Sequence, residues 1–503
     1  MISPPRRPIL SLSLSIIVAL AHAGCRVDQK KEVARYEGVL RGNLLSDERA
    51  FEPGEPLSLR QALDLTNRQN ERLAIEGENY VQALIARRRA AAAFLPTVSL
   101  APSYTVRQRV SDNGDDDDTG SGGGGGGSTA QNRTFDVPLR GEANVFNGFA
   151  DVARLRSTRQ TVEQRRNLLL DLQEAVLLDT AQVYYDVLRA ERSVEVLKNS
   201  LQVQEARVRD ITGRQRAGMA RPLDVAQTEA QASATRVGLI NALNDVRNGR
   251  ATLSFLTAAP VVDAPLVEQF EAPAEPPPLE TLRETAVARR RDLAAAQAAA
   301  RAARQNVQAA VGQYYPSVTL NAQLFLYRES FPDERRWDAL LSANLPIFSA
   351  GLIQADVREA WSLFRQAGMT ESLLRRQVMQ EVQLAYQDLL TTDQRIAELQ
   401  TQLAAAQQAF NQADQSYNVG LATNLERVAA QDQLLTAQLQ LTSARFDRTL
   451  SYFALARVTG SLRHELETSP STMPATAPTT VPADHRPLST LREGRAAGVS
   501  IDN

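Results

Sequence analysis

The chain contains two very long helical stretches, each of which ends in a glycine turn and continues as a second helix. Before the later turn, apolar residues recur alternately three and four positions apart, the spacing of a coiled-coil seam. These residues are Ile396, Leu399, Leu403, Ala406, Phe410, Ala413 and Tyr417. Gly420 favours the left-handed conformation that ends a helix, and Asn424 is a favourable N-cap for the helix that follows. A helix of about 65 residues is roughly 100 Å long, so we expect the helices to form a rod or a tube.

The turn occurs twice with the same pattern. Gly218–Asp224 and Gly420–Glu426 each place Ala two, Leu five and an acid six residues after the glycine. The segments that lead into the two turns also match, and an Asp- and Gly-rich tract at 111–132 accounts for the greater length of the first copy. The sequence therefore predicts an internal duplication.

Each copy also contains two segments with the two-residue period of a β-strand. In the first copy we expect a helix from Leu59 to Leu95, which Phe94-Leu95-Pro96 ends, and polar and apolar residues alternate after it. In the second copy Tyr314-Tyr315-Pro316 precedes the same alternation. Strands of about 10 residues are long enough to cross a bilayer when they are tilted. We predict β-hairpins at about 97–146 and 317–347.

Two hairpins per chain cannot close a barrel, and open sheet edges are not tolerated in lipid. Three chains would give a closed barrel of twelve strands, and large barrels enclose a water-filled lumen. Arg140 and Glu142 lie on the polar face of a returning strand. We expect them either to point into the lumen or to form one cross-strand pair without a role in transport.

Composition excludes several classes of function. The formal net charge is −2, so no basic field attracts nucleic acid. Three histidines and one cysteine give no basis for a His/Cys metal site or for a disulfide within the chain. No convincing Ser/His/Asp or paired-carboxylate pattern is found. We therefore predict that the protein is not an enzyme and uses no cofactor.

The N-terminus has the features of an export signal. Arg6 and Arg7 precede an apolar run from Ile9 to Ala21, which is too short for a good membrane span. Ala21-His22-Ala23 would allow ordinary cleavage, whereas Ala23-Gly24-Cys25 resembles a bacterial lipobox that would leave Cys25 lipidated. We favour lipidation, because the one cysteine of the chain lies where lipidation requires it.

The predicted layout follows from these boundaries. It comprises a signal peptide at 1–24, an irregular N-terminal periplasmic segment at 25–56, a first repeat at 57–258, a Pro-rich linker at 259–278, a second repeat at 279–462 and a disordered tail at 463–503.

From about Leu57 to Gly460 the chain resembles the TolC-like outer-membrane efflux protein family. The resemblance rests on the duplicated strand starts described above and on the strand ends Phe146-Asn147-Gly148 and Phe348-Ser349-Ala350-Gly351. It also rests on the Tyr-x-Val-Gly-Leu turn that begins at Tyr417. The resemblance implies a mainly α fold in which three chains share a transmembrane β-barrel and a long α-helical coiled-coil barrel. It also implies a location in the outer membrane of a Gram-negative-type envelope, with the helices in the periplasm.

The resemblance further implies which residues carry the function. The entrance or gate residues would be Asp224, Glu426 and Tyr417, and the turns that dock a periplasmic adaptor protein would contain Gly218, Met219, Gly420 and Leu421. Each of these residues also has a purely structural explanation. An acid in the first turn stabilises its own helix by roughly 0.3–1 kcal/mol, and glycine commonly ends a helix. Tyr417 in turn completes the apolar seam.

One position departs from the family pattern. Where family members have an arginine two residues after the turn glycine, this chain has Ala422. Arg221 or Arg427 would replace that arginine only partly in a salt bridge that closes the entrance.

The predicted function is therefore the outer-membrane channel of a tripartite efflux system. The channel would be a homotrimer that exports small molecules passively, driven by an inner-membrane transporter through the adaptor. An outer-membrane component of a type I protein secretion system would share this architecture. A periplasmic coiled-coil scaffold is a third alternative, against which the alternating strand faces argue.

Overall fold

The computed structural model describes residues 28–41, 54–106, 133–268, 270, 272–273, 275–328 and 336–468. The signal peptide, Cys25, the tract at 111–132 and the chain after residue 468 lie outside these ranges. The elements are α2 (Gln29–Arg41), α3 (Leu59–Gln69), α4 (Glu71–Ala92), β1 (Thr97–Leu100), β2 (Ser103–Val106), β3 (Arg133–Asn147), α5 (Ala150–Arg216), α6 (Pro222–Thr257), α7 (Leu279–Arg289), α8 (Arg291–Gly312), β4 (Ser317–Arg328), β5 (Trp337–Asn344), α9 (Leu352–Asn418), α10 (Asn424–Val458) and α11 (Leu462–Thr468).

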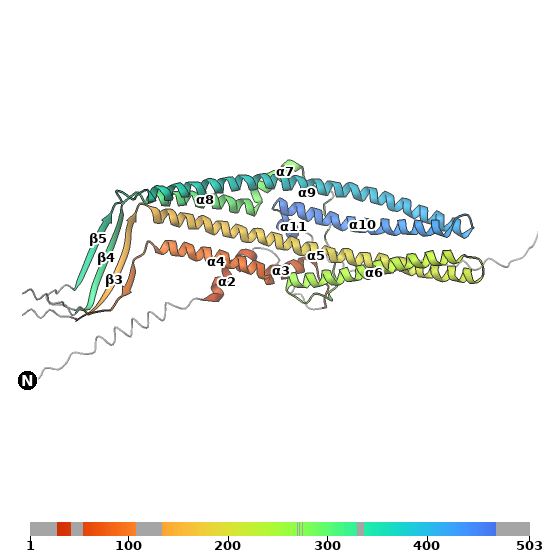
Figure 1. Cartoon of the computed structure of the whole chain (residues 1–503), viewed down its shortest axis with the longest axis horizontal. Coiled ribbons are helices and arrows are strands. Elements are labelled where there is room, and N and C mark those ends of the chain that lie inside the picture. Colours follow the sequence, from red (N-terminus) through yellow and green to blue (C-terminus); the bar gives the residue numbers. More distant parts are fainter. Residues whose placement is uncertain are drawn as a thin grey trace, which may run out of the picture. The chain divides into compact units, whose positions relative to one another are not determined.

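The prediction of two very long helices is confirmed. Helices α5 and α9 each contain 67 residues, which corresponds to about 100 Å of helix. Each is followed by a turn and by a shorter helix that packs back along it, α6 on α5 and α10 on α9. The strands adjoin one end of these helices, and the two turns lie at the other end (Figure 1).

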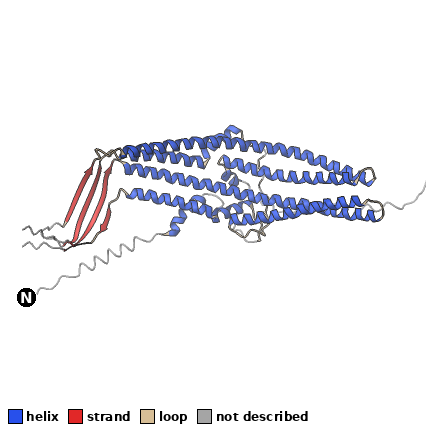
Figure 2. Cartoon of the chain, in the orientation of Figure 1, coloured by secondary structure: helices blue, strands red, loops and turns tan. Residues whose placement is uncertain are grey.

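The helices next to the sheet continue the order of the strands. The strands pair in the order β1-β3-β4-β5, and β2 pairs with β3 beside β1. Helix α4 packs against α5, α5 against α8, and α8 against α9. In the chain, α4 leads into β1, β3 into α5, α8 into β4 and β5 into α9. The strands and these helices therefore form one continuous layer (Figure 2). Towards the turns, α10 packs against α5, so the pair α5–α6 lies beside the pair α9–α10.

One face of the sheet is mainly polar and the other is mainly apolar, with Leu340, opposite Asn321, as an exception on the polar face. Thr319 pairs with Ser342 on β5, and their hydroxyl oxygens lie 2.8 Å apart. The neighbouring pair, Leu320 and Leu341, points to the opposite face, because side chains alternate along a strand. The register places further polar residues on the first face, namely Ser99, Arg140, Glu142, Asn144, Asn321, Gln323 and Asp338. Arg140 and Glu142 are therefore on the polar face, as the sequence predicts.

The main hydrophobic core lies midway along the long helices. It includes Tyr184 and Phe453, which are fully buried, and it draws on α3, α5, α6, α7, α9, α10 and α11. The Tyr184 hydroxyl lies 2.8 Å from the Leu57 carbonyl oxygen and accepts the Val267 N–H at 3.0 Å. This tyrosine therefore fixes part of the segment predicted as a linker at 259–278 to the core, so that segment is not a free connection.

The N-terminal segment differs from the prediction of an irregular chain, because it contains the helix α2. Tyr36 and Leu40 on one side of α2 are buried, and they pack with Leu73 and Val81 of α4. The Tyr36 ring occupies space above Gly77, where a Cβ atom would lie 2.5 Å from a ring carbon. The sequence did not predict α2, because two apolar residues in a mostly polar segment do not show a clear helical period.

Three other predicted boundaries are corrected. The helix expected from Leu59 to Leu95 is broken at Asn70, whose extended backbone and side chain cap α4. The first strand is interrupted at Pro102, which lacks an N–H group to donate to the sheet. The disordered tail cannot begin at residue 463, because α11 extends to Thr468 and buries Leu462 and Leu466 in the main core.

Candidate functional site

The two turns have the same hydrogen-bonded geometry. Gly218 has a φ of 72° and Gly420 a φ of 79°, which is the left-handed region that favours glycine. The N–H of Met219 donates to the Arg214 carbonyl at 2.8 Å, and that of Leu421 donates to the Ser416 carbonyl at 2.8 Å. Both turns are therefore Schellman-type helix ends. The Met219 and Leu421 side chains are 74 % and 84 % exposed, which makes them the apolar tips of the two helix pairs.

Asp224 is buried in the first turn of α6. Its carboxylate accepts the backbone N–H of Arg221 at 3.1 Å and the guanidinium of the same residue at 2.9 Å. The hydrogen bond from this guanidinium lowers the pKa of Asp224, which keeps the carboxylate charged. Within the chain, Asp224 thus caps its own helix.

Glu426 occupies the equivalent position on α10 but is exposed. Its carboxylate accepts the Thr423 N–H at 2.7 Å, and the Thr423 hydroxyl accepts the Glu426 N–H at 3.3 Å. This reciprocal pair is a capping box, with Thr423 as the N-cap. The prediction of Asn424 as the N-cap is therefore wrong by one residue.

Tyr417 stacks with a buried arginine. The Arg427 guanidinium carbon lies 3.8 Å from the centre of the Tyr417 ring, and that of Arg214 lies 5.9 Å away. A cation over an aromatic face is stabilised by the ring quadrupole. Arg427 is only 4 % exposed and also donates to the Asn424 side-chain oxygen at 2.9 Å. It therefore faces Tyr417 and Asn424 within the chain.

Asn424 links the two helix pairs, a role that the sequence analysis missed. Its amide nitrogen lies 3.1 Å from the Asp224 carbonyl oxygen and 3.1 Å from the Thr228 hydroxyl, both on α6. An asparagine beside a helix start suggests a cap, so its sequence context concealed this contact. Tyr417, Arg427, Asn424 and Asp224 thus form one connected set of contacts, which we call the tip link.

A second set of polar contacts lies further from the turns. Arg207 on α5 lies 3.5 Å from the Asp414 carboxylate on α9 and donates to Gln431 on α10. Burial and the positive charge of Arg427 lower the pKa of Arg207. Gln231 on α6 donates to the Asp432 carboxylate on α10 at 2.7 Å. The pairs α5–α6 and α9–α10 are therefore joined at several levels near the turns.

The family model for outer membrane efflux proteins matches the chain in two stretches, residues 58–259 and 282–461. The chain belongs to the outer membrane efflux protein family. It is a TolC-like efflux protein of the Gram-negative outer membrane.

Three relatives of this efflux protein align with more than half of its length. The outer membrane efflux protein BepC of Brucella suis is 25% identical over 341 residues, 67% of this chain and 74% of the relative. The outer membrane protein TolC of Escherichia coli is 23% identical over 359 residues, 64% of this chain and 72% of the relative. The pyoverdine export outer membrane protein OpmQ of Pseudomonas aeruginosa is 27% identical over 311 residues, 60% of this chain and 65% of the relative.

Solved structures show the same fold. The outer membrane protein VceC of Vibrio cholerae has a TM-score of 0.69 at 20% identity, with 80% of this chain and 96% of that chain covered. The outer membrane channel CmeC of Campylobacter jejuni has a TM-score of 0.70 at 16% identity, with 83% and 90% covered.

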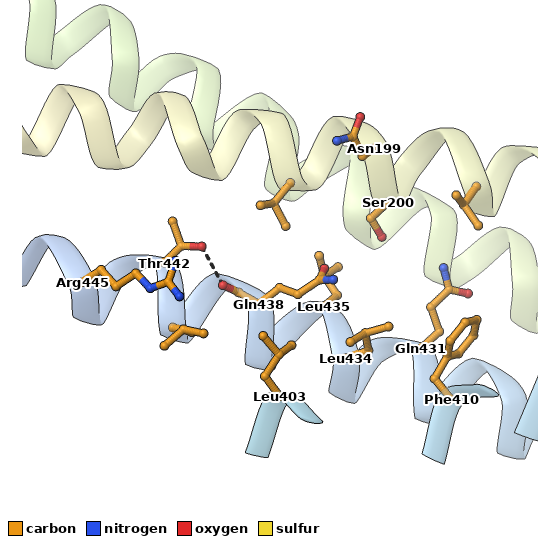
Figure 3. A pocket seen from close by; sticks show the side chains of 13 residues that line it. Asn199, Ser200, Leu403, Phe410, Gln431, Leu434, Leu435, Gln438, Thr442 and Arg445 are labelled. Atoms are coloured by element: carbon orange, nitrogen blue, oxygen red, sulfur yellow. Dashed lines mark hydrogen bonds between the residues drawn. The ribbon is translucent and has the colours of Figure 1, made fainter. Parts of the chain in front are cut away.

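A groove runs along this efflux protein between α5 and α10, beside the end of α9 (Figure 3). Its volume is about 470 Å³ and its walls are mainly apolar, including Val203, Leu403, Phe410, Leu434, Leu435 and Leu441. Gln438 and Thr442 add polar groups on α10, where the Thr442 hydroxyl donates to the Gln438 carbonyl at 2.8 Å. The groove ends close to the tip link, because Phe410 and Gln431 line it as well.

Two further findings concern the candidate residues. Cys25, the candidate lipidation site, lies outside the described residues. Within the described ranges, no helix has an apolar stretch long enough for a membrane crossing, and no group of three His, Cys, Asp or Glu side chains is placed to hold a metal ion.

Proposed function

We propose that three copies of this outer membrane efflux protein form the channel of a tripartite export system. The observation that carries the proposal is the sheet, which is mainly polar on one face, mainly apolar on the other and, among the described residues of one chain, open at both edges. In lipid, open edges leave backbone groups without partners. Three sheets joined edge to edge satisfy these groups and surround a polar lumen, which Arg140 and Glu142 would line. We interpret the two halves of the chain as copies of one unit, because their elements follow the same order.

The helices would continue this barrel into the periplasm, because their order follows the order of the strands. The entrance would lie at the turns, where Asp224, Glu426 and Tyr417 are found. Transport through such a conduit is passive, so an inner-membrane transporter supplies the energy through a periplasmic adaptor. One relative is named for pyoverdine export, which supports an export role. The outer-membrane component of a type I protein secretion system is the alternative, since it would use the same architecture.

Conductance of the purified protein in planar bilayers tests this function. We expect discrete conductance steps from the wild type and larger steps from Asp224→Ala/Glu426→Ala. The double substitution removes the capping acids of both turns and loosens the entrance, at roughly 0.3–1 kcal/mol per helix. If neither protein conducts after verified insertion, the channel proposal fails.

The exposed apolar tips are proposed to dock the adaptor. Met219 and Leu421 extend into solvent from the two turns, and the groove of Figure 3 lies on the same helix pairs, with Phe410 and Gln431 in its lining. An amphipathic helix of a partner would bury its apolar side on such a surface. We expect Met219→Asp/Leu421→Asp to weaken adaptor binding at least about tenfold, which corresponds to roughly 1.4 kcal/mol. Pull-down with the cognate adaptor measures the change.

Val262→Asp is the matched control for this experiment. Val262 is an apolar residue with 47 % exposure in the segment that precedes α7, away from both turns. Its substitution should leave adaptor binding intact. Equal loss of binding in the control and in the tip variant would contradict docking at the turns.

We also propose that Cys25 is lipidated, and the orientation of α2 supports this. Near the start of α2, the Glu32 carboxylate lies 3.8 Å from the Arg88 guanidinium, which is close to the sheet end of α4. Near the end of α2, the Leu40 carbonyl oxygen accepts a hydrogen bond from the Gln173 amide, which is further from the sheet. The start of α2 thus points towards the sheet. Mass spectrometry of the mature N-terminus should find Cys25 with attached lipid. An unmodified chain that begins at Gly24 would exclude lipidation.

A further inference from the structure

Three arginines converge on a small pocket between α5 and α8. Arg156 and Gln160 contribute to it from α5, and Arg301, Arg304 and Gln305 from α8. The pocket has a volume of about 240 Å³, and these five polar residues form its whole lining. It therefore differs from the groove near the turns, whose walls are mainly apolar.

The positive charges of this pocket are not neutralised within the described part of the chain. No described carboxylate forms an ion pair with Arg156, Arg301 or Arg304, and the Nε of Arg301 donates instead to the neutral Gln160 at 2.8 Å. Other arginines on α5 have acidic partners, as in the pairs Arg154–Asp151 at 3.6 Å and Arg165–Glu76 at 3.7 Å. These three arginines are exposed, so water screens part of the repulsion between their charges, and an anion between them would remove the rest.

Gln305 provides an independent indication of a missing ligand. Its side-chain oxygen is buried and has no hydrogen-bond partner among the described residues. This oxygen is a hydrogen-bond acceptor, so a hydroxyl group of the ligand would satisfy it. The pocket thus offers guanidinium groups, which match the oxygens of a phosphate group, beside one amide oxygen that would accept from a hydroxyl.

The pocket lies near the sheet. Arg156 is in the second turn of α5, and Arg304 is about two turns before the end of α8, so both are roughly 9–12 Å from the helix ends that adjoin the strands. If the sheet crosses the outer membrane, this level is next to the phospholipid headgroups of the periplasmic leaflet. It is equally accessible to a phosphorylated compound in solution.

We propose that the pocket formed by Arg156, Arg301 and Arg304 binds a phosphate group. The ligand is either the headgroup of an anionic phospholipid or a free phosphate compound, and both present the same oxygens to the arginines. The site is separate from the entrance and goes beyond the proposed transport function. A failure of the protein to conduct would leave this inference intact.

Two binding experiments on the purified full chain distinguish the sources. In the first, pyrophosphate is titrated calorimetrically into protein in an uncharged detergent. In the second, native mass spectrometry counts phosphatidylglycerol molecules that stay bound to the protein after release from nanodiscs. Saturable binding of pyrophosphate identifies a free anion, whereas retention of the lipid without pyrophosphate binding identifies a headgroup.

The variants decide whether either ligand uses this pocket. Arg301→Gln/Arg304→Gln should reduce affinity about a hundredfold, because a hydrogen bond to a charged group contributes roughly tenfold or more. Arg156→Gln alone should reduce it about tenfold. Arg154→Gln is the matched control, since Arg154 lies on the same turn of α5 but pairs with Asp151. Absence of binding to both ligands, or equal binding by the double variant and the control, would overturn the proposal.

Discussion

Gly148→Ala is expected to prevent α5 and α8 from meeting at the base of the sheet. A Cβ atom at Gly148 would lie 2.1 Å from the Gly312 carbonyl oxygen and 2.8 Å from the Tyr315 Cβ. The φ of 63° adds strain for any residue other than glycine. Overpacking costs about 1–3 kcal/mol and the left-handed conformation about 1–2 kcal/mol, so we expect a loss of roughly 2–5 kcal/mol in the free energy of unfolding.

Gly351→Ala separates the two contributions. Gly351 precedes α9 with a φ of 84°, but apart from its own chain neighbours no atom lies within 4 Å of the position that its Cβ would take. This variant should therefore lose only the backbone contribution of about 1–2 kcal/mol. Denaturant unfolding of both purified variants measures the difference. Equal stability of the two alanine variants would show that the contact between Gly148 and Gly312 is not a tight one.

Asn424→Ala is expected to open the proposed entrance. The substitution removes the two hydrogen bonds from Asn424 to Asp224 and Thr228, which join the two helix pairs. At about 1 kcal/mol for each bond, one chain loses roughly 2 kcal/mol and a trimer roughly 6 kcal/mol. A shift of about 5.5 kcal/mol moves a two-state equilibrium from 1:99 to 99:1. We therefore expect a mostly closed channel to become a mostly open one, measured as conductance in planar bilayers.

Asn411→Ala is the control for this effect. Asn411 lies on α9 before the same turn, and its side chain accepts a hydrogen bond from Gln407 of its own helix at 3.1 Å. Its loss should leave conductance at the wild-type level. If Asn424→Ala and Asn411→Ala conduct alike, the tip link does not hold the entrance closed.

Periodicity in the sequence predicted the largest elements correctly. The apolar seam that ends at Tyr417 predicted α9, and the turn glycines predicted where α5 and α9 end and where α6 and α10 follow. A regular period over many residues is compatible with few other secondary structures. The alternation after Pro96 and Pro316 likewise predicted the strands and placed Arg140 and Glu142 on the polar face. These predictions depend on local patterns that repeat over many residues.

The missed features depend on contacts between distant parts of the chain. Helix α2 is held by Tyr36 above Gly77, and neither residue alone indicates the other. Asn424 contacts Asp224 and Thr228, which are about two hundred residues earlier in the chain. The arginine pocket needs α5 and α8 side by side before its residues form a group. Which residues meet across helices is set by packing, and single-chain periodicity carries no information about it.

Cross-linking of the two open sheet edges tests the central claim most directly. Ser99 on β1 and Ser342 on β5 lie on the polar face at opposite edges of the sheet, and the proposed lipidation of Cys25 would leave the chain without a free thiol. With cysteines at both positions, a bis-maleimide should link each chain to its neighbours in the membrane and give covalent dimers and trimers on a denaturing gel. Single-cysteine variants should stay monomeric on the same gel. A ladder that continues beyond three chains, or protein that remains monomeric with both cysteines, would contradict a barrel closed by three copies.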